Sequence, residues 1–478
     1  MLFNSLDFVL FIVLFFCLWP LLRQRKNLRW GYLVVASSVF YGWWDWRFLF
    51  LILASGLIDF LAALIMVRFH RLRRVMLVGS IIGNIGSLAV FKYLDFCIGN
   101  VNWLFEACGI NCNVHQAGLI LPIGISFYTF QSLSYTVDVY RGQLKPTHNP
   151  LHFFAYLAMF PQLVAGPIVR AKDLLPQLEI AHNTTEQQRW DALRLIAWGY
   201  FKKMVIADSL APIVNLAFSA NTLSPISAYW WMIIAMFALQ IYCDFSGYSD
   251  IARGLAKWMG YDFPVNFNHP YLARSLRDFW GRWHISLSTW FRDYVYIPLG
   301  GSRCSRGRAE WNMWMTMLLS GLWHGAAWNF LIWGGWHAAI LSLERLTDWP
   351  RKLGCVWLGR YIATVLVFGL VLVGWVFFRA ESFGQAVAIL RTMFSFTAGQ
   401  GNWVAEQLGV KSLLCMAIMI ISELYFYVGL DRLPWDGIRL PRSGIPISRI
   451  AQPIAVAFIL TMCIFMRGPG STFIYFRF

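Results

Sequence analysis

Two histidines interrupt a stretch of the chain that is otherwise almost entirely apolar. The stretch 311–345 carries His324 near its middle and His337 further on, with glycine, alanine and serine around His324. An imidazole at bilayer depth is costly unless it faces protein or a water-filled path, so His324 is a candidate for proton transfer. A histidine bonded between two helices for packing alone is the alternative. We interpret His337 as structural, because its spacing from His324 does not suit a shared metal site.

A second candidate histidine lies in the stretch 270–300, which is neither a span nor an ordinary loop. Its periodicity predicts a single amphipathic helix at the membrane interface. The predicted apolar face comprises Trp280, Trp283, His284, Leu287, Trp290, Phe291 and Tyr294. The opposite face comprises Arg282, Ser286, Thr289, Arg292 and Asp293. A simple interfacial anchor would explain the periodicity, but it would give no role to His284 on the buried face.

Two carboxylates precede this stretch. Asp244 and Asp250 lie near the inner end of a predicted span, with Arg253 and Lys257 following. Buried charges usually pair, so structural ion pairs with the nearby arginines are the favoured interpretation. The alternative is that a carboxylate orients a catalytic group.

The composition is that of a polytopic membrane protein and excludes a soluble globular one. The 478 residues are 58% hydrophobic and 13% charged, with a mean hydropathy of +0.54. Apolar runs of about 20 residues can each cross roughly 30 Å of hydrocarbon. We expect one integral-membrane domain over 1–478, with broken or re-entrant segments at 150–169 and 311–345. The predicted spans are 6–22, 28–44, 47–67, 75–96, 117–139, 190–219, 226–256, 360–378, 411–430 and 450–466.

The distribution of lysine and arginine between the loops predicts the orientation of these spans. The net charge is +16, but the basic residues lie in short loops, so we expect membrane lipids or a phosphorylated cofactor as partners and no nucleic acid. Placing the basic loops in the cytoplasm puts both termini outside. The densest basic region, 274–308, is then cytoplasmic, and the loop 97–116 and the tail 471–478 face outward.

Nine cysteines show no metal-type spacing, and we expect no metal. Cys17, Cys243, Cys415 and Cys463 lie in apolar runs and are predicted core residues. Cys97, Cys108 and Cys112 fall in one predicted outward loop. Whether Cys108 and Cys112 form a disulfide there is left open by the sequence.

Three passages together carry a family resemblance: CDFSGYSDIARGL, FWGRWHISLSTWFRDYVYIPLGG and LLSGLWHGAAWNFLIWGGWHA. In this order and spacing they resemble the membrane-bound O-acyltransferase (MBOAT) family, and within it the members that acetylate bacterial alginate. The likeness extends upstream through 121–142 and 160–170. One departure is Gly281, where a second arginine is expected, on the rim of the predicted helix.

The resemblance implies an all-α membrane helical bundle of about 10–12 spans, with re-entrant and interfacial helices around a central tunnel. It implies that His324 is the catalytic residue at a thin partition in that tunnel and that His284 lies on its cytoplasmic side. Acetyl-CoA would be the acetyl donor. The protein would lie in the bacterial inner membrane, and a periplasmic partner would place the acetyl group on an exported polysaccharide.

The residues themselves fit this interpretation. The basic region 270–308 can receive the nucleotide phosphates of acetyl-CoA. We expect four side chains to contact the donor: Arg282, Arg292, Trp283 and Asn329. A buried, neutral imidazole at His324 can accept a proton from an attacking hydroxyl and return one to the leaving thiolate.

The tail sequence STFIYFRF resembles the C-terminal motif of a small partner in teichoic-acid D-alanylation, a related system. This resemblance suggests Tyr475 as an acyl relay, which would divide one transfer across the membrane into two easier steps. The alternative is an aromatic tail that docks a periplasmic acetyltransferase or acetyl-carrier protein.

Two other function classes remain. A transporter or flippase also has many spans and broken helices, but no inverted repeat is visible in this sequence. A scaffold that recruits periplasmic acetyltransferases would explain the tail but leave His284 and His324 without a role. Alginate, cellulose and peptidoglycan are all candidate acceptors, with alginate or cellulose favoured.

Overall fold

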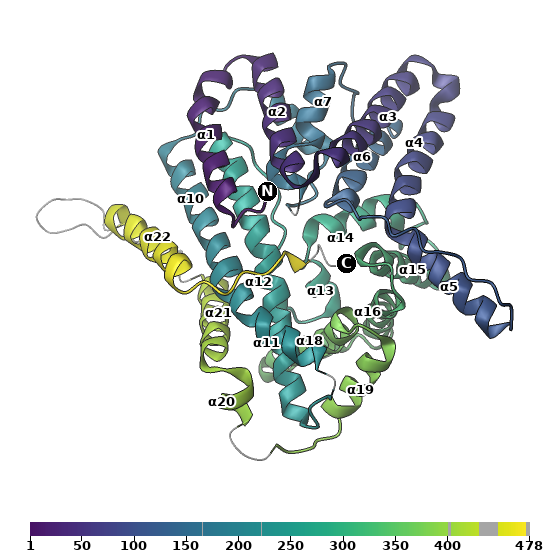
Figure 1. Ribbon diagram of the computed structural model, residues 1–478, viewed down its shortest axis with the longest axis vertical. Helices are drawn as coiled ribbons and strands as arrows, with labels where there is room; N and C mark the ends of the chain where they lie inside the picture. Colours follow the sequence, from purple (N-terminus) through teal and green to yellow (C-terminus); the bar gives the residue numbers. More distant parts are fainter. Residues whose placement is uncertain (165, 221, 400–402, 430–447, 475–478) are drawn as a thin grey trace, which may run out of the picture. The chain divides into compact units, whose positions relative to one another are not determined.

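The computed structural model describes residues 1–164, 166–220, 222–399, 403–429 and 448–474, which fold into helices with no strand among them (Figure 1). The predicted all-α fold class is confirmed. The chain divides into two compact units. The first comprises Met1–Arg189, Leu255–Pro264 and Gly325–Ala327, and the second comprises the described residues of 190–254, 265–324 and 328–478.

The first unit consists of helices that pack through apolar faces. Helices α3, α4 and α6 lie side by side. The ring of Phe160 packs edge-on against Phe11 and Phe15, at centroid distances of 5.2 and 5.1 Å. The elements are α1 (Leu6–Leu22), α2 (Lys26–Asp45), η1 (Trp46–Phe48), α3 (Leu49–Arg68), η2 (His70–Leu72), α4 (Arg73–Leu88), η3 (Ala89–Tyr93), α5 (Leu94–Ala107), α6 (Ile125–Tyr140), α7 (Pro150–Leu157), α8 (Phe160–Leu163) and α9 (Ala171–Glu179).

The predicted break in the stretch 150–169 is confirmed. Helix α7 ends at Leu157 and α8 covers only Phe160–Leu163. Proline cannot donate a backbone hydrogen bond, so Pro161 is tolerated in the first turn of α8 but cannot continue a longer helix through it.

The second unit contains the candidate histidines. Its elements are most of α10 (Glu186–Tyr200), η4 (Phe201–Ala207), α11 (Asp208–Ser219), most of α12 (Ser227–Met259), η5 (Pro270–Leu272), α13 (Leu276–Trp280), α14 (Ile285–Phe291), η6 (Arg292–Tyr296), α15 (Arg306–His324), α16 (Trp328–Thr347), α17 (Trp349–Gly354), α18 (Trp357–Arg379), α19 (Phe383–Met393), α20 (Trp403–Leu408), α21 (Val410–Val428) and α22 (Ser448–Phe465).

Helix α12 packs so closely against α10 and η4 that the backbones touch. A Cβ on Gly247 would lie 2.7 Å from the carbonyl oxygen of Gly199, and a Cβ on Gly254 would lie 2.8 Å from that of Ala192. Small residues permit such close approach of apolar helices. The side chains beside Gly247 on α12 therefore reach those of η4 directly.

The predicted interruption of 311–345 is also confirmed. Helix α15 ends at His324 and α16 begins at Trp328. The two helices pack on each other through glycine: a Cβ on Gly321 would lie 2.2 Å from the carbonyl oxygen of Phe330. This contact fixes the end of α15, and with it His324.

Five helical stretches among the described residues are long and apolar enough to cross a membrane. They are Lys26–Arg68, His70–Ala107, Ser227–Met259, Trp357–Arg379 and Val410–Val428. Two shorter apolar helices cover Leu6–Leu22 and Ile450–Phe465. The chain is thus a multi-pass membrane protein. The predicted span 117–139 is shorter than expected, because α6 begins only at Ile125.

The predicted single helix over 270–300 is wrong. The structure divides this stretch into η5, α13, α14 and the π-helix η6, with His284 between α13 and α14 in a left-handed conformation at φ 42°. The cause lies outside the stretch. The side-chain oxygen of Asn266 accepts hydrogen bonds from the backbone N–H of Ser286 at 3.2 Å and from its hydroxyl at 2.9 Å. Ser286, predicted on the polar face, is therefore buried.

The cysteines differ from expectation in two places. All nine are free thiols, so Cys108 and Cys112 are not joined, and Cys97 lies inside α5 instead of in their loop. Cys17 is exposed, because the buried face of α1 comprises Phe8, Phe15 and Trp19. The other predicted core cysteines are buried: Cys243, Cys415 and Cys463.

The contact between α15 and α16 yields a matched pair of substitutions. A Cβ on Gly334 would lie 2.5 Å from the carbonyl oxygen of Met317, whereas a Cβ on Gly335 meets nothing closer than 3.8 Å. We expect Gly334→Ala to destabilise the protein by about 1–3 kcal/mol through overpacking. Gly335→Ala should be neutral or stabilise by up to about 1 kcal/mol, since alanine favours helix. Thermal denaturation of both variants in detergent measures the difference. Equal melting temperatures would contradict the close contact.

Candidate active site

His324 ends α15 inside a wall of aromatic rings. Its side chain is 3% exposed. Trp323, Trp333 and Phe378 meet the imidazole edge-on, at centroid distances of 5.0, 5.0 and 5.4 Å. These rings come from α15, α16 and α18, so the packing of three helices fixes the imidazole in a region from which water is largely excluded. Electrostatic interactions are stronger in such a low-dielectric site.

His284 is fully buried, at 0% exposure, and is held by Asn266. Its Nδ1 lies 3.2 Å from the side-chain oxygen of Asn266. That oxygen already accepts the backbone N–H of Ser286, so it is the acceptor and Nδ1 carries the proton. The lone pair is then on Nε2, which fixes the tautomer. Burial lowers the pKa of His284 to about 3, so the ring is neutral at pH 7.

One tryptophan connects the two histidines. The ring of Trp323 lies 6.0 Å from the ring of His284 and 5.0 Å from the ring of His324. On its other side, His284 meets the edge of Phe245, on α12, at 4.6 Å. The structure thus brings together two histidines that are forty residues apart in sequence, with a single indole between them.

His337 is packed as a core residue. Its ring lies 4.7 Å from Trp333, 5.2 Å from Trp280 and 6.3 Å from Phe279. A Cβ on Gly374 would lie 3.1 Å from its Nε2, so α18 passes directly over the ring. These contacts agree with the structural role expected from its spacing.

The four residues expected to contact a donor occupy different environments. Arg292 is exposed and forms an ion pair with Asp293 at 2.6 Å. Arg282 forms an ion pair with Asp278 at 2.7 Å. Trp283 is fully buried, and Asn329 donates a hydrogen bond to the carbonyl oxygen of Ala380 at 2.8 Å. Arg292 also lines a cavity.

That cavity lies between the segment α13–η6 and helix α15. It has a volume of about 260 Å³, and Arg277 and Arg292 line it together with mostly apolar side chains. Ser320, on α15, also lines it and lies one helical turn before His324. A pocket with apolar walls and a few polar groups is the common form of a small-molecule site.

The carboxylates of α12 pair with lysines that the sequence analysis did not single out. Asp244 contacts Lys203 at 2.8 Å, so its predicted arginine partner is wrong. Asp250 pairs with Lys202 and, as expected, with Arg253 at 3.3 Å. Lys202 and Lys203 are adjacent lysines inside the predicted span 190–219. Because buried lysines require charged partners, they could have predicted these ion pairs.

The chain returns to α12 after α22, as the yellow segment in Figure 1 shows. Phe473 is buried at 0% exposure, with its ring 4.5 Å from Tyr248 and 5.7 Å from Phe245. The backbone N–H of Ile474 donates a hydrogen bond to Asp244 at 2.7 Å. Tyr475 lies outside the described residues.

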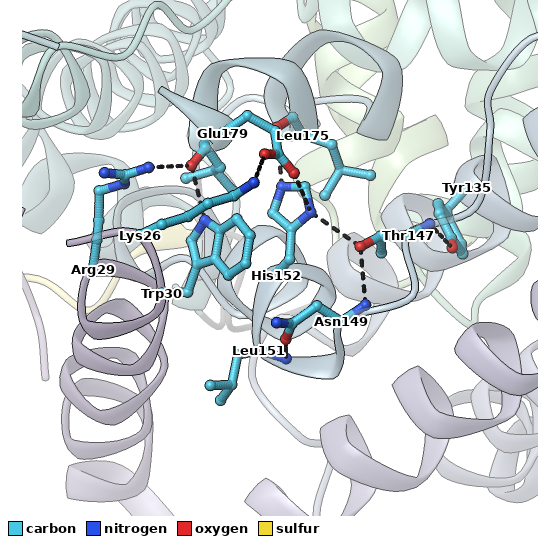
Figure 2. A network of polar contacts seen from close by, with 11 residues as sticks. Lys26, Arg29, Trp30, Tyr135, Thr147, Asn149, Leu151, His152, Leu175 and Glu179 are labelled. Atoms are coloured by element: carbon cyan, nitrogen blue, oxygen red, sulfur yellow. Dashed lines mark hydrogen bonds and ion pairs between the residues drawn. The ribbon is translucent and has the colours of Figure 1, made fainter. Parts of the chain in front are cut away.

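His152, in the first unit, belongs to a network that fastens α7 between α2 and α9 (Figure 2). Its Nε2 donates to the carbonyl oxygen of Leu175 at 3.0 Å, so its Nδ1 accepts from the hydroxyl of Thr147 at 3.0 Å. The indole of Trp30 stacks on the ring at 4.3 Å. Lys26 pairs with Glu179 beside it. Both ring nitrogens are engaged, which assigns His152 a structural role.

Within the described ranges, no three histidine, cysteine or acidic side chains gather as a metal site.

Comparison with known proteins gives the site a context. The sequence matches the model of the membrane-bound O-acyltransferase family (MBOAT) over residues 142–378, a range that contains both His284 and His324. It is 40% identical to the probable alginate O-acetylase AlgI of Pseudomonas aeruginosa over 485 aligned positions, covering 96% of this chain and 91% of that protein.

Two further relatives carry other names. The peptidoglycan O-acetyltransferase of Helicobacter pylori is 34% identical, over 76% of this chain and 73% of that protein. The teichoic acid D-alanyltransferase of Bacillus subtilis is 28% identical, over 55% of this chain and 70% of that protein.

The bonds to Asn266 predict a strong local effect on stability. Asn266→Ala removes the buried oxygen that accepts hydrogen bonds from both Ser286 and His284. We expect it to destabilise the protein by about 2–4 kcal/mol. Asn268→Ala is the matched control, because Asn268 is exposed two residues away. Thermal denaturation in detergent compares the two variants. An Asn266→Ala protein as stable as Asn268→Ala would show that Asn266 does not hold His284.

Proposed function

The chain belongs to the membrane-bound O-acyltransferase family and is an acyltransferase, and from this premise we propose that it moves an acetyl group from cytoplasmic acetyl-CoA across the bacterial inner membrane for O-acetylation of an exported polysaccharide. The observation that carries the proposal is the position of His324. The imidazole is enclosed by aromatic rings, one turn along α15 from a cavity with two arginines in its wall.

The cavity supports acetyl-CoA as the donor. Phosphates of a nucleotide require cationic partners, and Arg277 and Arg292 supply them at the cavity wall. A pantetheine arm is slender and largely uncharged, which suits the apolar walls that continue to Ser320. The densest basic loops of the chain flank this segment, so the positive-inside rule favours a cytoplasmic location for the donor and a periplasmic location for both termini.

His324 would act as the general base. In the proposed step the phenol of Tyr475 gives its proton to the His324 ring, and the phenolate oxygen bonds to the acetyl carbonyl carbon. The carbon–sulfur bond breaks, and His324 returns the proton to the departing thiolate of coenzyme A. Positioned proton transfer of this kind contributes about 10²–10⁴-fold to a rate. The products are an acetyl ester on Tyr475 and free coenzyme A.

The described part of the tail supports Tyr475 as the relay. Phe473 contacts Phe245, and Phe245 contacts His284. Ile474, the residue before Tyr475, is buried against α12 through Asp244. The neutral ring of His284, beside Trp323, would complete the wall on the donor side.

The acceptor is proposed by analogy with the named relatives. Their names specify alginate, peptidoglycan and teichoic acid, so an exported polymer of the alginate or cellulose class is the proposed final acceptor. A periplasmic acetyltransferase or acetyl-carrier protein would take the acetyl group from the outward tail. The transporter and scaffold alternatives give the buried histidines no chemical role.

Radiolabelled acetyl-CoA and purified protein in detergent test the central assignment. We expect wild-type protein to become covalently labelled, and His324→Ala and Tyr475→Phe to carry no label. His324→Ala should also release coenzyme A about 10²–10⁴-fold more slowly. His70→Ala and Tyr361→Phe are matched controls, since both side chains are exposed. If coenzyme A release depends on His324 but not on Tyr475, the acyltransferase assignment stands and Tyr475 is not the relay. Indifference to His324 would overturn the assignment.

The donor cavity gives a separate kinetic prediction. Arg292→Ala removes a cation from the cavity wall without touching His324, so it should raise KM for acetyl-CoA about three- to tenfold and leave kcat unchanged. Arg303→Ala removes a charge from the same basic region at an exposed position outside the cavity. Steady-state kinetics on both variants distinguish them. An equal rise in KM would indicate general attraction by the basic loops instead of a site at this cavity.

A further inference from the structure

Three buried charged side chains form a cluster that the proposed chemistry does not use. The ammonium group of Lys203 lies 2.8 Å from a carboxylate oxygen of Asp208 and 2.8 Å from one of Asp244. Lys203 and Asp244 are each 1% exposed and Asp208 is 2% exposed. Two carboxylates thus share one ammonium group. Buried charges are costly unless fully paired, so this cluster requires additional donors.

The C-terminal segment supplies those donors. Ser471 donates its backbone N–H, at 3.2 Å, and its hydroxyl, at 2.6 Å, to Asp208. Ile474 donates its backbone N–H to Asp244 at 2.7 Å. In return, Lys203 donates to the carbonyl oxygen of Ser471 at 3.0 Å. The cluster therefore binds the segment chiefly through backbone groups, in the way that a protein binds an extended peptide.

Two further residues adapt the segment to this place. Gly468 donates its N–H to the carbonyl oxygen of Met204 at 2.8 Å, and a Cβ there would lie 2.2 Å from the backbone of Asp208. Phe473 inserts its ring beside Tyr248 and Phe245. The segment thus carries a recognisable pattern, Gly-x-x-Ser-x-Phe-Ile, over 468–474.

The receiving side is built by an irregular helix. Lys203 lies in η4, a π-helix that interrupts the run from α10 to α11. The extra residue of a π-turn shifts the side chains around the helix, and such turns occur often at functional sites. Here Lys202 pairs with Asp250 and Lys203 with Asp244, so two adjacent lysines reach two carboxylates on α12.

We propose that Lys203, Asp208 and Asp244 form a binding site for the chain's own C-terminal segment, and that they are positioning residues for acyl transfer. The site holds Ser471 and Ile474 by their backbones and presses Phe473 against Phe245, the ring that contacts His284. The site that holds Ser471–Ile474 is thus separate from the two histidines. The positioning role rests on the proposed function, whereas the binding role does not.

Digestion of the full-length protein with a broad-specificity carboxypeptidase tests the binding role. Mass spectrometry follows the removal of residues from the C-terminus. We expect digestion of wild-type protein to stop by Ile474, and Asp244→Asn to let it continue through Ser471 at least about tenfold faster, because the segment opens more often. Asp250→Asn is the matched control, since Asp250 is a half-buried carboxylate on the same helix and pairs with Lys202 and Arg253.

Substitutions in the tail itself keep the test decisive if Asp244→Asn does not fold. Phe473→Ala removes the buried ring without altering the helices, and Thr472→Ala changes an exposed neighbour. Phe473→Ala should lose protection and Thr472→Ala should keep it. A tail that remains protected in both Asp244→Asn and Phe473→Ala would overturn the binding site.

Kinetics on the same variants test the positioning role. We expect Asp244→Asn and Phe473→Ala to lower kcat for acetyl transfer about tenfold or more, with KM for acetyl-CoA unchanged, because only the placement of the tail is altered. Asp250→Asn and Thr472→Ala should match wild type. A released tail with unchanged kcat would overturn the positioning role. If wild-type protein shows no acetyl transfer that depends on His324, the proposed function is refuted instead. The digestion experiment still tests the binding role in that case.

Discussion

The backbone contact between α12 and the helical run α10–η4 is the constraint on which the second unit depends. Because Gly199 and Gly247 have no side chains, the helices approach closely enough for Lys203 to reach Asp244 at 2.8 Å within the protein interior. A wider separation would leave buried charges without partners, which typically costs several kcal/mol. Phe245 follows Asp244 directly on α12 and meets His284 on the other side. The same contact therefore sets both the charged cluster and the position of one histidine.

Aromatic packing, more than hydrogen bonding, determines where the two histidines lie. His324 is enclosed edge-on by rings from three helices, and Trp323 extends from that enclosure to His284. Large rings have few rotatable bonds and pack in defined geometries, so they hold a catalytic group without adding charges that would perturb it. Asn266 adds a polar restraint that orients His284. Such a site holds the imidazole of His324 in a fixed place, as the proposed general-base chemistry requires.

The sequence predicted the helices and the interruptions within 150–169 and 311–345, because apolar periodicity and small residues are local signals. It also singled out His284 and His324, and the structure places both against Trp323. It failed where a distant partner decides the local structure. The stretch 270–300 is not one helix, since Asn266 accepts hydrogen bonds from Ser286 and stabilises the turn at His284. Asp244 pairs with Lys203, forty-one residues earlier, although Arg253 is nearer in sequence. No periodicity within one segment contains that information.

The tail is recognised by groups that differ from those proposed to react. Backbone amides of Ser471 and Ile474 bind carboxylates, and the ring of Phe473 packs against Tyr248 and Phe245 on α12. The carboxylate oxygens that bind the segment are already engaged in hydrogen bonds and ion pairs, so the cluster can hold the segment without competing for an acetyl group. Separating the binding groups from the reacting groups allows each to be optimised independently. A relay residue needs to be held near the base but must still be reached by a partner, and anchoring it through the residues before it meets both requirements.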